Sequence, residues 1–150
     1  MSDYNVRLQW QRVTPDFQYH SYDRKHTIYF YGGPKIDISS SANLVRNPQF
    51  QTPEELLTAA VASCFLLTFL SLCCKQGYVV NHYNDKATCI LDETIRAVSE
   101  VILRPEICFQ NDKKPDEGSL QKLLKDAHAA CFIANTLKAD ISVNPVILSE

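Results

Sequence analysis

The stretch that decides the fold is TPEELLTAAVASCFLLTFLSLCC at residues 52–74. It begins as a helix should, because Thr52 and Glu55 match the Thr-x-x-Glu capping box and Pro53 suits the first helical position. Gly77 is suited to the end of the helix. No charged residue follows Glu55 within the stretch. A helix that is apolar on every side is buried in protein or lies in lipid.

The uncharged run has the length of a short membrane span. Ala, Ser and Thr dilute its hydrophobicity, and neither an aromatic belt nor a basic cluster flanks it. We therefore predict a helix covered by protein and no membrane association. Because one domain of 150 residues has difficulty burying such a helix alone, we expect a second subunit to supply part of the cover.

Composition predicts one globular domain over residues 1–150, with 45% hydrophobic and 21% charged residues. The formal net charge of -2 gives no reason to expect nucleic acid or an anionic membrane as a partner. The first residues contain no apolar run, so no signal peptide is predicted and a cytoplasmic protein is expected.

The six cysteines include no Cys-x-x-Cys pair, so we predict no structural zinc, and neither a metal nor a cofactor is called for. Without a signal peptide a disulfide framework is not expected. Four of the cysteines are expected to be structural, as small apolar side chains: Cys73, Cys74, Cys89 and Cys108.

The remaining chain is predicted to form strands and one further helix. Alternating or apolar patterns predict strands at residues 5–13, 26–31, 35–39, 78–93, 97–110 and 140–148. Apolar residues at helical spacing predict a second helix at residues 119–137. Because no strand–helix–strand repeat is visible, the fold class predicted is α+β with an antiparallel sheet.

Cys64 lies in the middle of the apolar stretch and is the first candidate for chemistry. A nucleophilic cysteine must be a thiolate, yet burial among apolar side chains disfavours thiolates. The helix dipole offers no help about three turns from Thr52, since its influence fades within the first turn. A reactive Cys64 therefore needs a cation from another segment, and the alternative is an inert core cysteine.

Cys131 is the second candidate, in the segment DAHAACFIAN at residues 126–135. Its small alanines would let another helix approach closely, and His128 is one helical turn away. One alternative is a thiol hydrolase in which His128 serves Cys64 as a base, although no third orienting residue is evident. The other alternative is a plain helix-packing face.

These motifs together resemble the OsmC/Ohr family of osmotically inducible and organic hydroperoxide resistance proteins. The resemblance rests on PEELL at 53–57, ASCF at 62–65, AHAAC at 127–131 and VNP at 143–145, and it covers about residues 6–148. It implies an OsmC-like fold, in which an antiparallel sheet wraps around long central helices of an intertwined homodimer. Such a dimer would supply the missing cover for the apolar helix.

The resemblance also implies a thiol peroxidase. Carried over by position, Cys64 would be the peroxidatic cysteine and Cys131 the resolving one. A hydroperoxide would be reduced to an alcohol through a Cys64 sulfenic acid and a Cys64–Cys131 disulfide, which an external dithiol, often a lipoyl group in the family, would reopen. Four side chains suggest an apolar mouth suited to organic hydroperoxides: Phe50, Phe65, Leu66 and Phe132. The alternative is a dimeric binding or scaffold protein of the same fold with inert cysteines.

Glu54 matches the family's catalytic glutamate, which pairs with an arginine that holds the thiolate. A carboxylate is also favourable in a first helical turn without any catalytic role. Arg46 is our choice for the arginine, with Arg12 and Arg24 as alternatives. On an unbroken helix Glu54 would lie about 15 Å along the axis from Cys64. Either the helix breaks between them or Glu54 acts across the dimer.

Overall fold

The computed structural model describes residues 2–40 and 49–149. It divides the chain into two compact units, Met1–Leu56 and Leu57–Glu150, and each is described by itself. The long helix α1 (Pro53–Lys75) begins in the first unit and continues into the second.

The first unit holds a three-stranded antiparallel sheet in the order β1-β2-β3, made of β1 (Val6–Gln9), β2 (His26–Phe30) and β3 (Lys35–Ile38). Gly32 and Gly33 join β2 to β3 with φ angles of 98° and 111°, which glycine adopts at little cost. The three strands predicted before the helix are confirmed, with shorter bounds for the first.

The alternation of apolar and polar residues at 5–13 also predicts that this strand is half-buried, which is wrong for the single chain. β1 is an edge strand exposed along its whole length, and Val6 and Leu8, on its apolar side, are 61% and 59% exposed. The alternation of apolar and polar residues in β1 therefore marks a face that the described chain leaves uncovered.

Helix α1 is continuous over its 23 residues, and its two ends are built as the sequence predicts. At the start, the Thr52 N–H donates to Glu55 Oε2 at 2.8 Å and the Glu55 N–H donates to Thr52 Oγ1 at 3.3 Å, which is the reciprocal capping box. At the end, Tyr78 N–H donates to the Cys73 carbonyl and Gly77, with φ 78°, donates to the Cys74 carbonyl. This pair of bonds is a Schellman motif.

One face of α1 is buried and the rest is not. The buried face carries residues three or four positions apart, as a helix surface requires: Thr58, Val61, Phe65, Phe69 and Cys73. Elsewhere on the helix Leu67 is 66% exposed. By length and composition α1 is apolar enough to cross a bilayer, but core helices of globular domains pass the same test.

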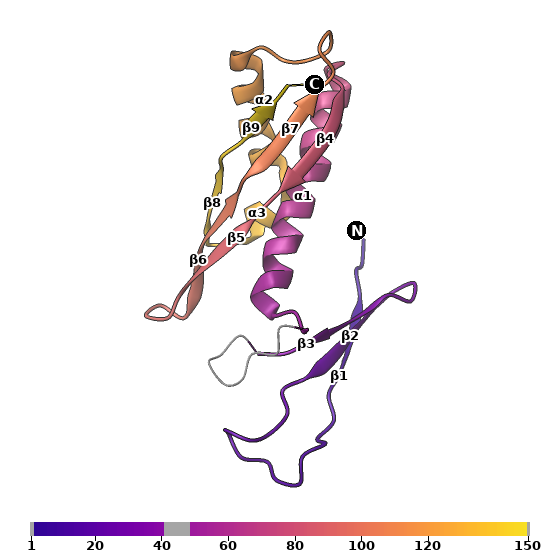
Figure 1. Cartoon of the computed structure of the whole chain (residues 1–150), viewed down its shortest axis with the longest axis vertical. Coiled ribbons are helices and arrows are strands. Elements are labelled where there is room, and N and C mark those ends of the chain that lie inside the picture. Colours follow the sequence, from indigo (N-terminus) through magenta and orange to yellow (C-terminus); the bar gives the residue numbers. More distant parts are fainter. Residues whose placement is uncertain (1, 41–48, 150) are drawn as a thin grey trace. The chain divides into compact units, whose positions relative to one another are not determined.

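The second unit wraps sheet and helix around that buried face. Its strands are β4 (Val80–Asp85), β5 (Thr88–Asp92), β6 (Ala97–Leu103), β7 (Pro105–Phe109), β8 (Asp140–Val143) and β9 (Val146–Leu148). They form two three-stranded sheets, β4-β7-β9 and β5-β6-β8. In Figure 1 these two sheets follow one another end to end beside α1. Each long predicted strand after the helix is thus two strands.

The α+β class is confirmed, but the two sheets of the second unit are mixed rather than purely antiparallel. β4 pairs with β7 and β5 with β6 in antiparallel fashion, whereas β8 runs parallel to β6 and β9 runs parallel to β7. The parallel pairs arise because the chain returns through a helix before β8 (Figure 1).

The junction between the two sheets is held by Arg104, between β6 and β7. Its backbone N–H donates to Asp85 Oδ1 at 2.7 Å, and its guanidinium donates to the Lys86 carbonyl and to Thr88 Oγ1. Pro105, which follows, has no N–H for the ladder. These contacts explain why the predicted strands 78–93 and 97–110 are interrupted at the same level.

The predicted second helix is broken at Cys131. Helix α2 (Glu117–Ala130) starts at Asp116, whose carboxylate accepts from the Ser119 N–H, and a short helix α3 (Phe132–Thr136) follows. Cys131 takes an extended conformation, φ -76° and ψ 109°, and is the cap of both helices. Asn135 Nδ2 donates to the Ala129 carbonyl at 2.9 Å, so a side chain satisfies one carbonyl that the break leaves without a helical partner.

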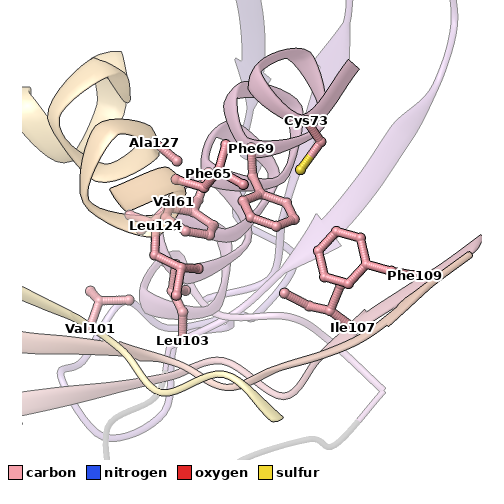
Figure 2. Packing of buried hydrophobic residues seen from close by; sticks show 11 residues of the cluster. Val61, Phe65, Phe69, Cys73, Val101, Leu103, Ile107, Phe109, Leu124 and Ala127 are labelled. Atoms are coloured by element: carbon pink, nitrogen blue, oxygen red, sulfur yellow. The ribbon is translucent and has the colours of Figure 1, made fainter. Parts of the chain in front are cut away.

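The hydrophobic core lies between α1, α2 and the two sheets. Figure 2 shows Phe65, Phe69 and Cys73 on α1 together with Phe109 and Ile107 on β7. The Phe69 ring lies 6.4 Å from that of Phe109. The other core side chains, several of them drawn in the same view, are Val61, Val101, Leu103, Leu123, Leu124 and Ala127.

Candidate functional site

The structure brings Cys64 and Cys131 together within the second unit. Cys64 lies in the middle of α1 and is half-buried, and Cys131 lies at the α2–α3 break and is 1% exposed. Their side chains form a hydrogen bond, and both are free thiols. Two cysteines far apart in the sequence thus have interacting side chains.

The environment of Cys131 favours its protonated form. Burial is the largest cause that raises the pKa of this thiol, and the hydrogen bond with Cys64 raises it further. Both effects favour the protonated form of Cys131. The backbone N–H groups of Ala134 and Ile133 act in the opposite direction and favour a Cys131 thiolate.

Two local contacts around the thiols were not foreseen from the sequence. Thr68 Oγ1 donates to the Cys64 carbonyl at 2.9 Å, a bond back to the preceding helical turn. The N–H groups that face Cys131 exist because α3 starts immediately after it. The position of Thr68, four residues after Cys64, is a sequence signal for the first contact. For the helix break, the corresponding signal in the sequence is Asn135.

Glu54 is not brought to the thiols by any break in α1. It is half-buried in the first helical turn, and the helix continues from there past Cys64 without interruption. Ten residues of continuous helix correspond to about 15 Å of rise. Of the two arrangements considered for Glu54, the broken helix is therefore wrong.

The arginine predicted to serve the thiolate, Arg46, lies outside the described residues. The two alternatives hold the loop between β1 and β2. Arg12 Nη1 donates to the carbonyls of Thr14 and Pro15 at 2.8 and 2.7 Å. Arg24 donates to the carbonyls of Tyr22 and Tyr19, and its guanidinium stacks 4.0 Å from the Tyr22 ring. Both guanidinium groups thus have local structural roles.

The predicted apolar mouth is only partly possible. Phe65 is 1% exposed and stacks 6.2 Å from Phe69 in the core, so it cannot line an opening. Phe132, adjacent to Cys131, is 83% exposed, and Leu66 is half-buried. Phe50 lies in the first unit, 5.1 Å from the Lys25 ammonium.

Among the described residues, no hydrogen bond joins the His128 ring to Cys64 or Cys131. Its carbonyl accepts the Cys131 N–H at 3.2 Å, which closes the end of α2. Its Nε2 atom is buried and makes no hydrogen bond to any described residue. Nothing in this geometry favours the thiol hydrolase alternative.

The other four cysteines lie apart from this pair. Cys73 is buried in the core, where burial raises the pKa of its thiol to about 11, and Cys108 is buried in β7. Cys89 is half-buried in β5, whereas Cys74 is exposed. Of these four cysteines, Cys74 is therefore the one that is expected to be a buried apolar side chain but is exposed in the single chain.

Comparison with known proteins places this arrangement in a family. The family model described as OsmC-like protein matches residues 47–146. Over 95 residues the chain is 28% identical to the peroxiredoxin OsmC of Escherichia coli, a match that covers 61% of this chain and 64% of that protein. It is 23% identical over 94 residues to the uncharacterized protein YmaD of Bacillus subtilis, covering 61% and 63%. The chain thus spans less than two thirds of the length of these relatives.

Solved structures agree over the whole chain. An OsmC-like protein of unknown function from Vibrio cholerae has a TM-score of 0.89 and 36% identity, covering 97% of this chain and 100% of that one. The organic hydroperoxide resistance protein OhrB of Bacillus subtilis has a TM-score of 0.64 at 15% identity and covers 98% of both chains, which shows a shared fold alone. The family match over residues 47–146, together with the shared fold, shows that this chain belongs to the OsmC-like family.

Proposed function

We propose that this protein is a cytoplasmic thiol peroxidase that reduces organic hydroperoxides to alcohols through Cys64 and Cys131. The observation that carries the proposal is the contact between these two thiols, from α1 and from the α2–α3 break. A peroxidase of this kind needs a second thiol close enough to attack the oxidised first one. The peroxiredoxin named among the curated relatives supports the same reaction class.

In the proposed reaction the Cys64 thiolate attacks one oxygen of the hydroperoxide. The O–O bond breaks, the other oxygen takes a proton and leaves as the alcohol, and Cys64 becomes a sulfenic acid. The Cys131 sulfur then attacks the Cys64 sulfur, its proton and the hydroxyl group leave as water, and a disulfide forms. An external dithiol, for example of the lipoyl type, restores both thiols and is itself oxidised to a disulfide.

The difference in burial supports Cys64 as the attacking thiol. Cys131 is 1% exposed, and burial raises the pKa of its thiol. Cys64 is half-buried and is the more accessible of the two residues. Arg46 and Glu54 remain our candidates for the groups that hold the thiolate.

We also propose that the working form is a homodimer. The uncharged surface of α1 beyond its buried face and the exposed apolar residues of β1 both call for cover that the described chain does not give. A second copy of the chain would supply it. In that dimer Glu54 would act on the Cys64 of the other subunit.

The test compares two single substitutions in a hydroperoxide-consumption assay with a dithiol reductant. Cys64→Ser is expected to abolish consumption. Cys131→Ser is expected to complete one turnover and to leave a sulfenic acid on Cys64, which dimedone labels. Equal steady activity in the two variants contradicts the proposal.

Thiol titration separates the peroxidase from the scaffold alternative. In the wild-type protein one equivalent of cumene hydroperoxide should remove two thiols together. Thiols that react slowly and ignore the hydroperoxide would favour a binding or scaffold protein with inert cysteines.

A further inference from the structure

The two sulfurs of the pair differ in how a second molecule can reach them. Cys64 is half-buried on α1, whereas Cys131 is 1% exposed at the α2–α3 break. We propose that, once the two are joined in a disulfide, an incoming thiol attacks the Cys64 sulfur and Cys131 leaves. This inference rests on the proposed pairing of the two cysteines and names the direction in which the site is reopened.

Access decides which sulfur of a disulfide is attacked. Cys131 offers almost no surface to an attacking thiolate, and Ala127 and Ala134, four residues before it and three residues after it, are 0% and 9% exposed. Cys131 lies where helix α2 ends and helix α3 begins. Cys64, in contrast, keeps part of its surface exposed in the described chain.

The surroundings of Cys131 act on a leaving thiolate in opposite directions. Burial, the largest cause, raises the pKa of this thiol, whereas the backbone N–H groups of Ala134 and Ile133 lower it. Because a thiol with a higher pKa leaves more slowly in thiol–disulfide exchange, the direction of attack rests on the difference in access between the two sulfurs.

The exchange balances as two displacements by an external dithiol. Its first thiolate forms a bond to Cys64 Sγ, the bond between the two cysteine sulfurs breaks, and the electron pair goes to Cys131 Sγ, which later takes a proton from water. The second thiolate of the dithiol then attacks the first sulfur of the same dithiol, which is bonded to Cys64 in the mixed disulfide. Cys64 leaves as a thiolate. The protein gains two electrons, and the dithiol becomes a cyclic disulfide.

The test uses the full chain with Cys74→Ser, which removes an exposed thiol that plays no part in the site. Diamide, rather than a peroxide, forms the disulfide. A short pulse of 2-mercaptoethanol then opens it, acid and N-ethylmaleimide stop the reaction, and fragment mass spectra locate the mixed disulfide. We expect it on Cys64, with maleimide on Cys131, by about tenfold or more over the reverse, a barrier difference of about 1.4 kcal/mol.

A mixed disulfide mainly on Cys131, or an equal distribution, overturns the inference. So does failure of diamide to join Cys64 to Cys131. Because diamide bypasses the peroxide step, a protein that ignores hydroperoxides but opens at Cys64 would contradict the proposed function alone. As controls, Cys64→Ser and Cys131→Ser in the same background each leave one thiol of the pair. With a disulfide reagent the remaining Cys131 should react slowly and the remaining Cys64 rapidly.

Discussion

If the two active sites of a dimer share residues, two inactive variants should restore each other. The perturbation is an equal mixture of Cys64→Ser and Glu54→Ala subunits. Within one α1, Glu54 and Cys64 are separated by about 15 Å of rise and about 80° of rotation. One arginine that contacts both a carboxylate and a thiolate needs them within about 8 Å, since each contact spans about 4 Å. Glu54 therefore cannot serve its own Cys64 in this way.

Random exchange makes half of the dimers mixed, and each mixed dimer has one complete site, so about a quarter of wild-type activity should return. The assay is hydroperoxide consumption after subunit exchange, which two different affinity tags on the subunits verify. A matched control mixes Cys64→Ser with Cys64→Ala, which cannot rebuild a site. Verified mixed dimers without activity would refute the shared site.

Three further predictions follow from the described contacts. Phe69→Ala should lower the free energy of unfolding by about 3–5 kcal/mol in denaturant titrations, because Phe69 is fully buried, whereas Lys125→Ala on the exposed side of α2 should change it by less than about 0.5 kcal/mol. Burial raises the folded-state pKa of Asp85 above 3.8, so its carboxyl contributes stability at low pH that is lost as the pH rises through the folded value. Asp85→Asn should flatten that loss in unfolding curves recorded from pH 4 to 7, and a slope equal to that of the wild type would contradict the sign. A variant without the four remaining thiols should fold and keep most peroxidase activity, and loss of activity with an intact fold would assign one of them a role: Cys73, Cys74, Cys89 and Cys108.

The helix at the centre of the fold could be predicted because its signals are local. The capping box at Thr52 and the positive φ at Gly77 depend only on neighbouring residues, and both are present as expected. The pairing of Cys64 with Cys131 could be expected only through the family resemblance. Periodicity says which residues share a face of one element, but not which two elements meet.

The structural features that the sequence did not predict are those that neighbouring elements impose. Apolar residues continue at helical spacing through Cys131 and predict a single helix, where the structure has two. The parallel pairing of β8 and β9 depends on the path of the chain after α2, which no local pattern records. Phe65 was placed at a mouth because it adjoins Cys64, yet one position along a helix turns a side chain by about 100°, here into the core.

The break at Cys131 has a consequence for motion. Helix α3 has only five residues, and its first side chain, Phe132, is 83% exposed. Segments with few internal bonds and little burial open locally at a small fraction of the global unfolding free energy. The buried Cys131 is thus followed directly by a short and weakly anchored helix. Backbone amides of α3 should exchange with deuterium well before those of α1. The exchange rate in α3 should therefore report oxidation and reduction of the neighbouring thiol, while exchange in the sheets stays the same.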